Sequence, residues 1–366
     1  MAVPPTLEII AHFQQQGEFL EAAAYGTGHI NDTFASSFRT DGRVVRYIHQ
    51  RINRHVFRQP VQVMENIVRV TRYAAERIRA AGGDPARETL TVIPALDGRP
   101  YYCTADGDYW RTYVFIEGAR TYDQVEDVRH VYTAANAFGK FQRLLAGLPG
   151  ERLHETIPGF HDTAKRFDAF VLALERDAHN RAATARAEID FILARAADAR
   201  VVVDLLAEGR MPERVTHNDT KLNNVMIDER TGEGICVIDL DTIMPGSALY
   251  DFGDLVRTGA VTGAEDERDL ARVRLDLEMF DYVAHGFLDA TCDVLTPIEI
   301  DHLVFGARLI TYEQAIRFLG DYLNGDTYYK THRPGHNLDR TRTQIKLLAE
   351  IEQHADTLDA IVTRYR

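Results

Sequence analysis

Apolar and polar positions divide the chain into a strand-like first third and a helical remainder. In the first third, short apolar or aromatic runs alternate with turn residues, and Asp-Gly pairs between such runs are a hairpin signal. The strands expected from this pattern are residues 33–35, 44–48, 90–93, 101–102 and 109–116. One helix is expected among them, from Pro60 to Ala81, because apolar residues recur there every three or four positions and Gly82-Gly83 follows.

Beyond Glu117-Gly118, apolar residues recur on one helical face in several long stretches. The helices expected are Val128–Leu145, Phe160–Leu174, Ala185–Glu208, Asp266–Leu288, Pro297–Leu323 and Gln344–Val362. A break between Val215 and Asp241 holds two short apolar segments, 224–227 and 235–238, which suit one small sheet. The pattern predicts an α+β, two-lobed protein. Residues 1–117 would form a small antiparallel sheet with one main helix, and residues 118–366 a larger, mostly helical lobe.

Composition narrows the classes of partner. The 366 residues are 45% hydrophobic and 27% charged, as in an ordinary globular protein. The net charge of −13 argues against a general affinity for nucleic acid or anionic lipid. Three cysteines without paired spacing suggest neither a disulfide framework nor a zinc site. With no basic leader and no run of about 18 apolar residues, a monomeric cytoplasmic protein without a membrane span is expected.

The segment with the most chemistry is Thr216-His-Asn-Asp-Thr-Lys-Leu-Asn-Asn. It places His217, Asp219, Lys221 and Asn224 in the order H-x-D-x-K-x-x-N, and Asp239 ends an apolar strand 15 residues later. This is the layout of a phosphoryl-transfer site, in which one carboxylate takes the proton of the acceptor hydroxyl while an amide and a second carboxylate hold magnesium.

These residue types suggest specific roles. Asp219 would be the base, Asn224 and Asp239 the Mg²⁺ ligands, and Lys221 would offset the charge that develops on the transferring group. His217 would pack and hydrogen-bond the loop rather than react. The alternative, that Asp and Asn only shape a turn, explains neither the full spacing nor the aspartate at the strand end.

Two further aspartate positions are less clear. The segment Asp251-Phe-Gly-Asp254 spells the magnesium-binding tripeptide of protein kinases, but it lies 32 residues past Asp219, and Asp239 is closer. We therefore expect Asp251 to brace the catalytic loop from below or to cap a helix. Asp241 is left open between a metal-binding and a structural role.

A nucleotide site is expected in the first third. Gly26 and Gly28 lie at a hairpin tip, where backbone amides could approach phosphate, although an ordinary hairpin fits as well. His29, at the same tip, could face the acceptor or have no role in the site. The third strand, Arg46 to Arg51, contains no lysine, so Gln50 or a nearby arginine would have to make the phosphate contacts.

Residues that could bind the adenine base and the acceptor come next. Backbone groups of Phe115, Ile116 and Glu117 could bind adenine, or the segment could be a core strand that runs into a linker. Arg317 and Asp321 are spaced i, i+4, which by itself favours a surface salt bridge. A polar and aromatic cluster would suit either a sugar or an ordinary loop, and it consists of Asp326, Tyr328, Tyr329, His332 and His336.

At these motifs the sequence resembles the aminoglycoside and choline phosphotransferase superfamily, and within it the N-acetylhexosamine 1-kinases. The matching stretches are Gly28-His-Ile-Asn31, Val215–Asn224, Ile238–Ser247, Asp251-Phe-Gly-Asp254, Arg317-Phe-Leu, Asp321-Tyr-Leu and Arg342–Leu347. The resemblance implies a protein-kinase-like fold and transfer of phosphate from ATP to the anomeric hydroxyl of N-acetylglucosamine or N-acetylgalactosamine.

The same resemblance implies roles for individual residues. Asp219 would again be the base, with Asn224 and Asp239 as the Mg²⁺ ligands. Contact with the sugar would come from His29, Asp219, Arg317 and Tyr328, with Asp321 beside them. The sugar 1-kinases also have glutamine where Gln50 replaces the strand lysine.

Two rival functions remain. One is a kinase for choline, homoserine or an aminoglycoside, but a cationic acceptor would favour extra acid at its site, whereas Arg317 and His29 suit a neutral polyol. The other is a nucleotide-binding module without catalysis, which the missing lysine supports and which the intact Asp219, Asn224 and Asp239 oppose.

Overall fold

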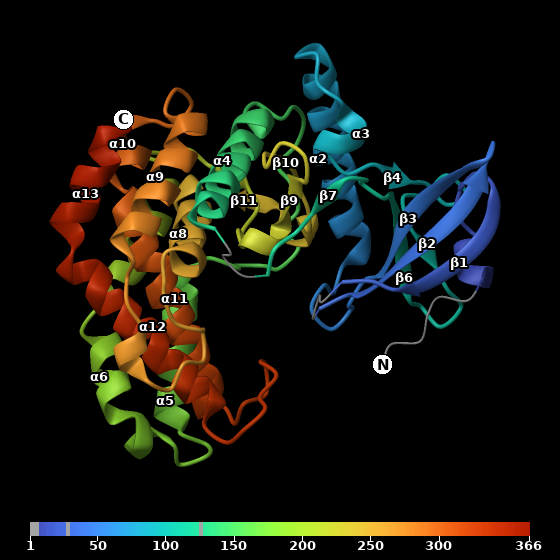
Figure 1. Cartoon of the computed structure of the whole chain (residues 1–366). Coiled ribbons are helices and arrows are strands. Elements are labelled where there is room, and N and C mark those ends of the chain that lie inside the picture. The colour runs from blue at the N-terminus through green and yellow to red at the C-terminus, as the bar shows by residue number, and fades with distance from the viewer. Residues whose placement is uncertain (1–6, 27–29, 124–126) are drawn as a thin grey trace. The chain divides into compact units, whose positions relative to one another are not determined.

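A computed structural model describes residues 7–26, 30–123 and 127–366 (Figure 1). The chain has the expected α+β fold, with an antiparallel sheet in its N-terminal part and helices in its C-terminal part. It forms two compact units, each described by itself. The first unit contains Met1–Arg120, Gly147–Pro158 and Met226–Met244, and the second contains Thr121–Ala146, Gly159–Val225 and Pro245–Arg366. The sequence-based division after residue 117 concerns function and stays a prediction.

The strands are β1 (Glu18–Ala24), β2 (Asp32–Thr40), β3 (Arg43–Arg51), β4 (Val92–Ile93), β5 (Tyr102–Cys103), β6 (Tyr109–Val114), β7 (Ala119–Arg120), β8 (Arg214–Thr216), β9 (Val225–Asp228), β10 (Gly234–Val237) and β11 (Met244–Gly246). The α-helices are α1 (Leu7–Ile10), α2 (Pro60–Ala80), α3 (Pro85–Glu88), α4 (Val128–Leu145), α5 (Thr163–Arg176), α6 (Arg186–Leu193), α7 (Val201–Ala207), α8 (Ala248–Gly259), α9 (Leu277–Thr291), α10 (Pro297–Asp301), α11 (Leu303–Leu323), α12 (His336–Gln353) and α13 (Ala355–Arg364).

The first unit is built on an antiparallel sheet in the order β1-β2-β3-β6-β4, with β5 also paired to β6 (Figure 1). Asp41 and Gly42 both have positive φ, 50° and 77°, as the hairpin between β2 and β3 requires. The Asp-Gly signal at this turn is therefore confirmed. Strand β1 was not expected, because its sequence EFLEAAA lacks a clear alternation of apolar and polar residues.

A buried asparagine on α2 ties two later segments into the first unit. The side-chain amide of Asn66 donates to the carbonyls of His154 and Ile243, at 2.8 and 3.0 Å, and its oxygen accepts from the His154 amide at 3.0 Å. A smaller sheet, ordered β10-β9-β7, completes this unit. These contacts position the turn that follows β10, where Asp239 lies.

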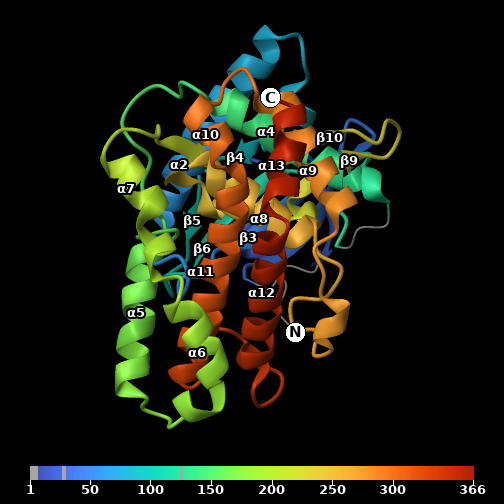
Figure 2. The same ribbon diagram turned by 90° about the vertical axis from the view of Figure 1, so that its left-hand side faces the viewer.

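The second unit is organised around α11, which is buried along most of its length. It packs against α5, α8 and α12, and Figure 2 shows α5, α6, α11 and α12 running close together. Helix α8 crosses α11 closely because two glycines meet there: a Cβ atom on Gly253 would lie 2.4 Å from the carbonyl oxygen of Gly306. Within the described ranges, no helix has the length and apolar composition of a membrane-spanning segment.

Several expected helices are interrupted or shifted. The stretch 185–208 divides into α6 and α7, joined by a 3₁₀ turn, and the stretch 297–323 divides at His302. The stretch 266–288 becomes helical only at Leu277, because the side chain of Asp276 caps the amides of Glu278 and Met279 and fixes the start there. Helix α12 begins at His336, before the expected Gln344.

Candidate active site

The candidate catalytic loop, residues 217–224, connects β8 to β9 and is anchored by buried polar residues. Thr216, His217 and Thr220 are fully buried. His217 packs edge-on against the ring of Phe138, with centroids 5.1 Å apart, and its Nδ1 lies 3.3 Å from the Asp219 amide. The prediction that His217 packs and supports the loop is confirmed. The loop leaves the Asp219 side chain 24% exposed, between the buried residues Asn218 and Thr220.

Asp251, in the first turns of α8, braces this loop. Its carboxylate accepts hydrogen bonds from the amides of His217 and Asn218, at 3.0 and 2.8 Å, and from the side chain of Gln142 at 2.7 Å. Burial raises the pKa of Asp251, although the charge of His217 and these hydrogen bonds act in the opposite direction. The expected brace is confirmed, whereas the N-cap of α8 is Ser247.

A second acid of α8, Asp254, holds the loop at Thr220, two residues beyond Asn218. Its Oδ2 accepts from the Thr220 amide at 2.8 Å, and its Oδ1 pairs with Arg257 at 2.7 Å. Burial acts to raise the pKa of Asp254, but the charges of Arg257 and Lys221 outweigh it and leave that pKa below its usual value. The sequence showed Asp254 beside Asp251 but did not reveal this role.

The structure brings Asp219, Lys221 and Asn224 together. Lys221 Nζ lies 2.6 Å from Asp219 Oδ1, and Asn224 Nδ2 donates to the Asp219 carbonyl at 2.9 Å and lies 3.2 Å from its Oδ2. Burial acts to lower the pKa of Lys221, yet the negative charges of Asp219 and Asp254 raise it above its usual value. Lys221 is therefore a fixed positive charge beside the candidate base.

Asp239 belongs to the first unit, directly after β10. It is solvent-exposed and has left-handed backbone angles, φ 58° and ψ 58°, which are uncommon for a residue other than glycine. Such a conformation is often retained at a functional site. The following 3₁₀ turn, Leu240–Thr242, is held by the hydroxyl of Thr156, which donates to the Asp241 carbonyl at 2.9 Å.

The donor atoms of Asn224 and Asp239 suit magnesium. Since Asn224 turns its Nδ2 toward Asp219, its Oδ1 faces the other way, and amide and carboxylate oxygens are the hard ligands that Mg²⁺ takes. The described ranges contain no cluster of three or more His, Cys, Asp or Glu arranged to hold a metal. A nucleotide-bound Mg²⁺ needs only one or two protein carboxylates, because phosphates and water supply its other ligands.

Gln50 belongs to a buried network centred on Arg111 of β6. Arg111 Nε donates to Gln50 Oε1 at 2.9 Å, and its Nη1 forms an ion pair with Asp241 Oδ1. Asn31 donates to the other oxygen of Asp241 at 2.6 Å. The side chains of Arg111 and Asp241 are only 1% and 3% exposed. Burial acts to lower the pKa of Arg111, but the charge of Asp241 raises it overall.

This network answers the question that the sequence left open about Asp241. The carboxylate is paired with a buried arginine and therefore has a structural role. Arg111 is also the arginine near Gln50 that the sequence could not identify, because it lies within the apolar run 109–116 and looks like an outward-facing strand residue.

Hydrogen bonds from and to neighbouring residues hold the segment 115–117 in place. The Phe115 amide donates to the Arg46 carbonyl at 3.0 Å, and the Glu117 carbonyl accepts from Arg87 at 2.7 Å. Arg46 also pairs with the Glu117 carboxylate and stacks 3.7 Å from the centre of the Phe115 ring. Gly26 has φ 78° and open space around its Cα, whereas Gly28 and His29 lie outside the described residues.

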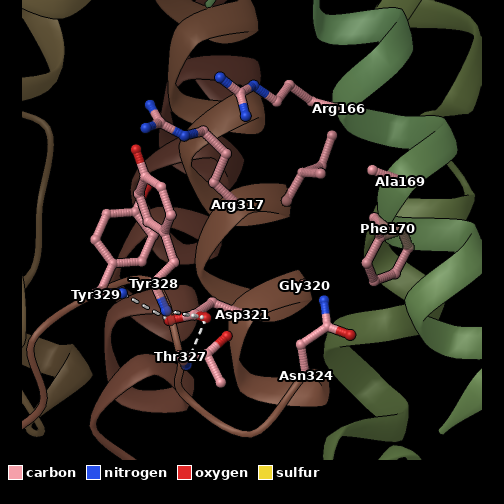
Figure 3. Close-up of a pocket in the computed structure, with 11 residues that line it drawn as sticks. Arg166, Ala169, Phe170, Arg317, Gly320, Asp321, Asn324, Thr327, Tyr328 and Tyr329 are labelled. Carbon is pink, nitrogen blue, oxygen red and sulfur yellow. Dashed lines mark hydrogen bonds between the residues drawn. The ribbon is translucent and has the colours of Figure 1, made fainter. Parts of the chain in front are cut away.

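Arg317, Asp321 and Tyr328 line a cavity of about 200 Å³ in the second unit, the α5–α11 pocket (Figure 3). Asp321 is almost fully buried, and it accepts from the amides of Thr327, Tyr328 and Tyr329 at 2.8 to 3.0 Å and from Asn337 at 2.8 Å. The interpretation of Arg317 and Asp321 as a surface salt bridge is wrong: Asp321 fixes the loop, and Arg317 faces the pocket.

The polar and aromatic cluster near residue 330 serves two purposes. Tyr328 and Tyr329 line the pocket, while Asp326 pairs with Arg181 and His336 pairs with Asp266 at 2.9 Å. Sequence reasoning missed Arg166 of α5, which also lines the pocket. Its position in an amphipathic helix gave no signal that distinguishes it from a surface arginine.

Comparisons with known proteins identify the family and the fold. The chain matches the family model described as the phosphotransferase enzyme family over residues 21–288. An aminoglycoside phosphotransferase from Alicyclobacillus acidocaldarius is 14% identical with a TM-score of 0.60, and the match covers 100% of this chain and 97% of that one. The amicoumacin kinase hAmiN, in complex with AMP-PNP, Ca²⁺ and Ami, is 12% identical with a TM-score of 0.58, covering 93% and 92%.

A choline kinase from Cryptosporidium parvum is 13% identical with a TM-score of 0.56, and the match covers 93% of this chain and 91% of that one. At such identities the structures share the fold. The family model, in contrast, spans well over half of the sequence. The chain therefore belongs to the phosphotransferase enzyme family.

Proposed function

We propose that this phosphotransferase uses ATP to phosphorylate the anomeric hydroxyl of an N-acetylhexosamine, N-acetylglucosamine or N-acetylgalactosamine, giving the α-1-phosphate and ADP. The observation that carries the proposal is the cluster of Asp219, Lys221 and Asn224 on a buried loop that Asp251 and Asp254 hold in place. A turn without catalytic purpose has no need of two buried acids to fix one partly exposed carboxylate.

Asp219 acts as the base in this proposal. Its carboxylate orients the acceptor hydroxyl and takes its proton as the oxygen attacks the γ-phosphorus. An anomeric hydroxyl is more acidic than an ordinary alcohol, so a carboxylate with a neighbouring lysine is sufficient. Lys221, fixed 2.6 Å from Asp219, adds positive charge where the transferring phosphoryl group becomes more negative.

The nucleotide and metal roles are proposals of the same kind. Asn224 and Asp239 would hold Mg²⁺, which neutralises phosphate charge when it is bound. Gly26, Gly28 and Gln50 would approach the phosphates, and backbone groups of residues 115–117 the adenine. Gln50 is held by Arg111, so any contribution of Gln50 depends on that arginine.

The charge of the α5–α11 pocket supports a sugar over the rival acceptors. Arg166 and Arg317 both line it, and its aspartate, Asp321, is used by four hydrogen bonds within the protein. Choline and aminoglycosides are cations, which two arginines repel. Arg317 and Tyr328, with Asp321 as the residue that positions their loop, and with His29, are the proposed sugar contacts.

The form of the enzyme is also a proposal. We expect a monomer. A reducing, cytoplasmic setting suits the free thiols of Cys103, Cys236 and Cys292. Residues 1–117 would contribute the nucleotide contacts, and residues 118–366 the catalytic loop and the sugar contacts. Size-exclusion chromatography with light scattering measures the oligomeric state directly.

The reaction is tested by coupled ADP release with N-acetylglucosamine, N-acetylgalactosamine, choline, homoserine and an aminoglycoside. Phosphorus NMR of the product then identifies the phosphorylated oxygen. An anomeric phosphate signal supports the proposal, and a signal from position 6, or turnover only with a cationic acceptor, overturns it.

The role of Asp219 is tested separately. Asp219→Asn should lower kcat by about 10²- to 10⁴-fold, the usual contribution of a general base, and leave ADP binding intact. Asp204→Asn, which makes the same chemical change on the exposed face of α7, should leave kcat unchanged. Full turnover by Asp219→Asn would falsify the assigned base.

A further inference from the structure

The α5–α11 pocket contains two guanidinium groups that come from different helices. Arg166 lies on α5 and Arg317 on α11, and Figure 3 shows both side chains directed toward the same end of the pocket. Within the described ranges, neither guanidinium has a carboxylate at ion-pair distance. Two positive charges therefore face one small cavity.

Both arginines are held in place by neutral groups, and Arg317 Nη1 donates to Gln314 Oε1 at 3.2 Å. The carbonyl of Phe160 accepts from Arg166 Nε and Nη2, at 3.3 and 3.2 Å, and the Phe160 ring lies 5.2 Å from the Arg317 guanidinium carbon. The ring of Tyr329 lies 5.8 Å from the same carbon. These contacts fix the direction of the side chains without forming an ion pair.

The nearest acids are committed to other partners. Asp321 accepts the three loop amides and Asn337, and Glu313 accepts from Thr163 at 2.7 Å and pairs with His161 at 2.9 Å. Glu313 is one turn before Arg317 and is almost completely buried, so it offsets part of the positive charge without entering the pocket lining.

The charge of Arg317 is unfavourable for Arg166. Burial lowers the pKa of Arg166, and the neighbouring charge of Arg317 lowers it further. Burial also acts to lower the pKa of Arg317, but the nearby Tyr329 and Glu313 raise it overall. An oxyanion placed between two planar guanidinium groups would remove this repulsion and could accept bidentate hydrogen bonds from each. The hydroxyls of Tyr328 and Tyr329 supply further donors at the pocket wall.

We propose that the α5–α11 pocket binds an oxyanion, a carboxylate, sulfate or phosphate group, through Arg166 and Arg317. The cavity of about 200 Å³ is smaller than the roughly 300–1,000 Å³ of sites for drug-sized ligands, so the group belongs to a small molecule. The oxyanion is either a substituent of the acceptor or a free inorganic anion. The first of these sources rests on the proposed sugar kinase activity. In both cases the two arginines are the binding residues.

The binding test uses the full chain without ATP or magnesium, so it is independent of kinase activity. Isothermal titration with inorganic phosphate and with sulfate, at constant ionic strength set by NaCl, should show saturable binding to the wild type. Arg166→Gln and Arg317→Gln should each weaken that binding by at least about tenfold, the range for a hydrogen bond to a charged group. Arg186→Gln, the same change at an exposed position of α6, should leave it unchanged.

A conservative variant separates binding from folding. Arg166→Lys keeps the charge but loses the planar fork, and it should bind phosphate with an affinity between those of the wild type and Arg166→Gln. Equal affinities in the wild type, Arg166→Gln and Arg186→Gln, or no binding to the wild type, would overturn the proposal.

The source of the oxyanion is read from acceptor kinetics. If the oxyanion is a substituent of the acceptor, N-acetylglucosamine 6-sulfate or a hexuronic acid should have a lower KM than the neutral sugar. Arg166→Gln should then remove that difference in KM. With a free anion, phosphate binding persists and the KM difference is absent from the wild type. Absence of any turnover would refute the proposed kinase activity and leave the titration result as it stands.

Discussion

The buried ion pair between Arg111 and Asp241 makes a sharp prediction about stability. In Arg111→Met, the methionine occupies similar volume but removes the positive charge, so Asp241 keeps only the hydrogen bond from Asn31 at 2.6 Å. In Asp241→Leu, Arg111 keeps Gln50 and the nearby ring of Tyr113 as its partners. Each single change therefore leaves one charge buried without its counterion.

The size of the expected stability loss follows from the burial of the two side chains. Side chains that are 1% and 3% exposed lose almost all hydration, and removing one partner of such a pair costs about 3–5 kcal/mol. Replacing both partners by apolar side chains removes both charges together, and such replacements are often neutral or even stabilising. The double variant should therefore be more stable than either single variant, with a coupling free energy of at least about 3 kcal/mol.

The chain offers a local probe for this measurement. Trp110, the single tryptophan, is buried on β6 next to Arg111, so its fluorescence reports unfolding of the first unit. Urea titration of the wild type, the two single variants and the double variant gives the four free energies. A matched cycle on Arg214 and Glu299, a buried pair in the second unit, should leave the midpoint reported by Trp110 unchanged where the two units unfold independently.

Two outcomes would contradict the reasoning. If Arg111→Met lowers the free energy of unfolding by less than about 1 kcal/mol, solvent must reach the ion pair, because exposed ion pairs contribute no more than this. Additive single effects in the double variant would mean that the two charges do not interact.

The remaining predictions concern a histidine, a glycine and an aspartate. Burial lowers the pKa of His49 to about 4. The unfolded chain, with a histidine pKa near 6.5, therefore binds more protons as pH falls from about 6.5 to 4, so stability should decrease by about 3 kcal/mol across that window. His49→Gln should flatten this slope in urea titrations, and an unchanged slope would contradict the burial argument. Gly253→Ala should lower the free energy of unfolding by at least about 2 kcal/mol, because the new Cβ would lie 2.4 Å from the Gly306 oxygen. In the control Gly259→Ala, the nearest neighbours of the new Cβ are 3.7 Å away, so the change should be neutral or stabilising. Asp251→Asn should cost about 2–3 kcal/mol and lower kcat, because a carboxylate that accepts two loop amides is replaced by a group that also donates; unchanged kcat would show that the catalytic loop keeps its shape without this brace.

Local patterns predicted the elements whose signals are contained in short stretches. The hairpin at Asp41-Gly42, the helix from Pro60 and the helix from Val128 to Leu145 all follow from turn chemistry or periodicity. The brace formed by Asp251 also followed, because its position after the catalytic loop left few other roles. Such features depend on a few neighbouring residues and so are visible in the sequence.

Other features depend on partners that are distant in sequence. Arg111 pairs with a residue 130 positions away, and nothing in its own strand indicates a buried charge. Arg166 looks like any polar position of an amphipathic helix until α11 places Arg317 beside it. Helix interruptions, as at His302, were missed because the apolar pattern continues across the break.

The way Asp321 holds the loop after α11 has a consequence for how the pocket wall tolerates substitution. Its carboxylate binds backbone amides of residues 327–329, so it fixes the course of the main chain whatever side chains those residues carry. Substitutions at Tyr328 or Tyr329 would therefore change the wall of the α5–α11 pocket without refolding the segment. The side chains that face the pocket are in this way separable from the main-chain path that carries them.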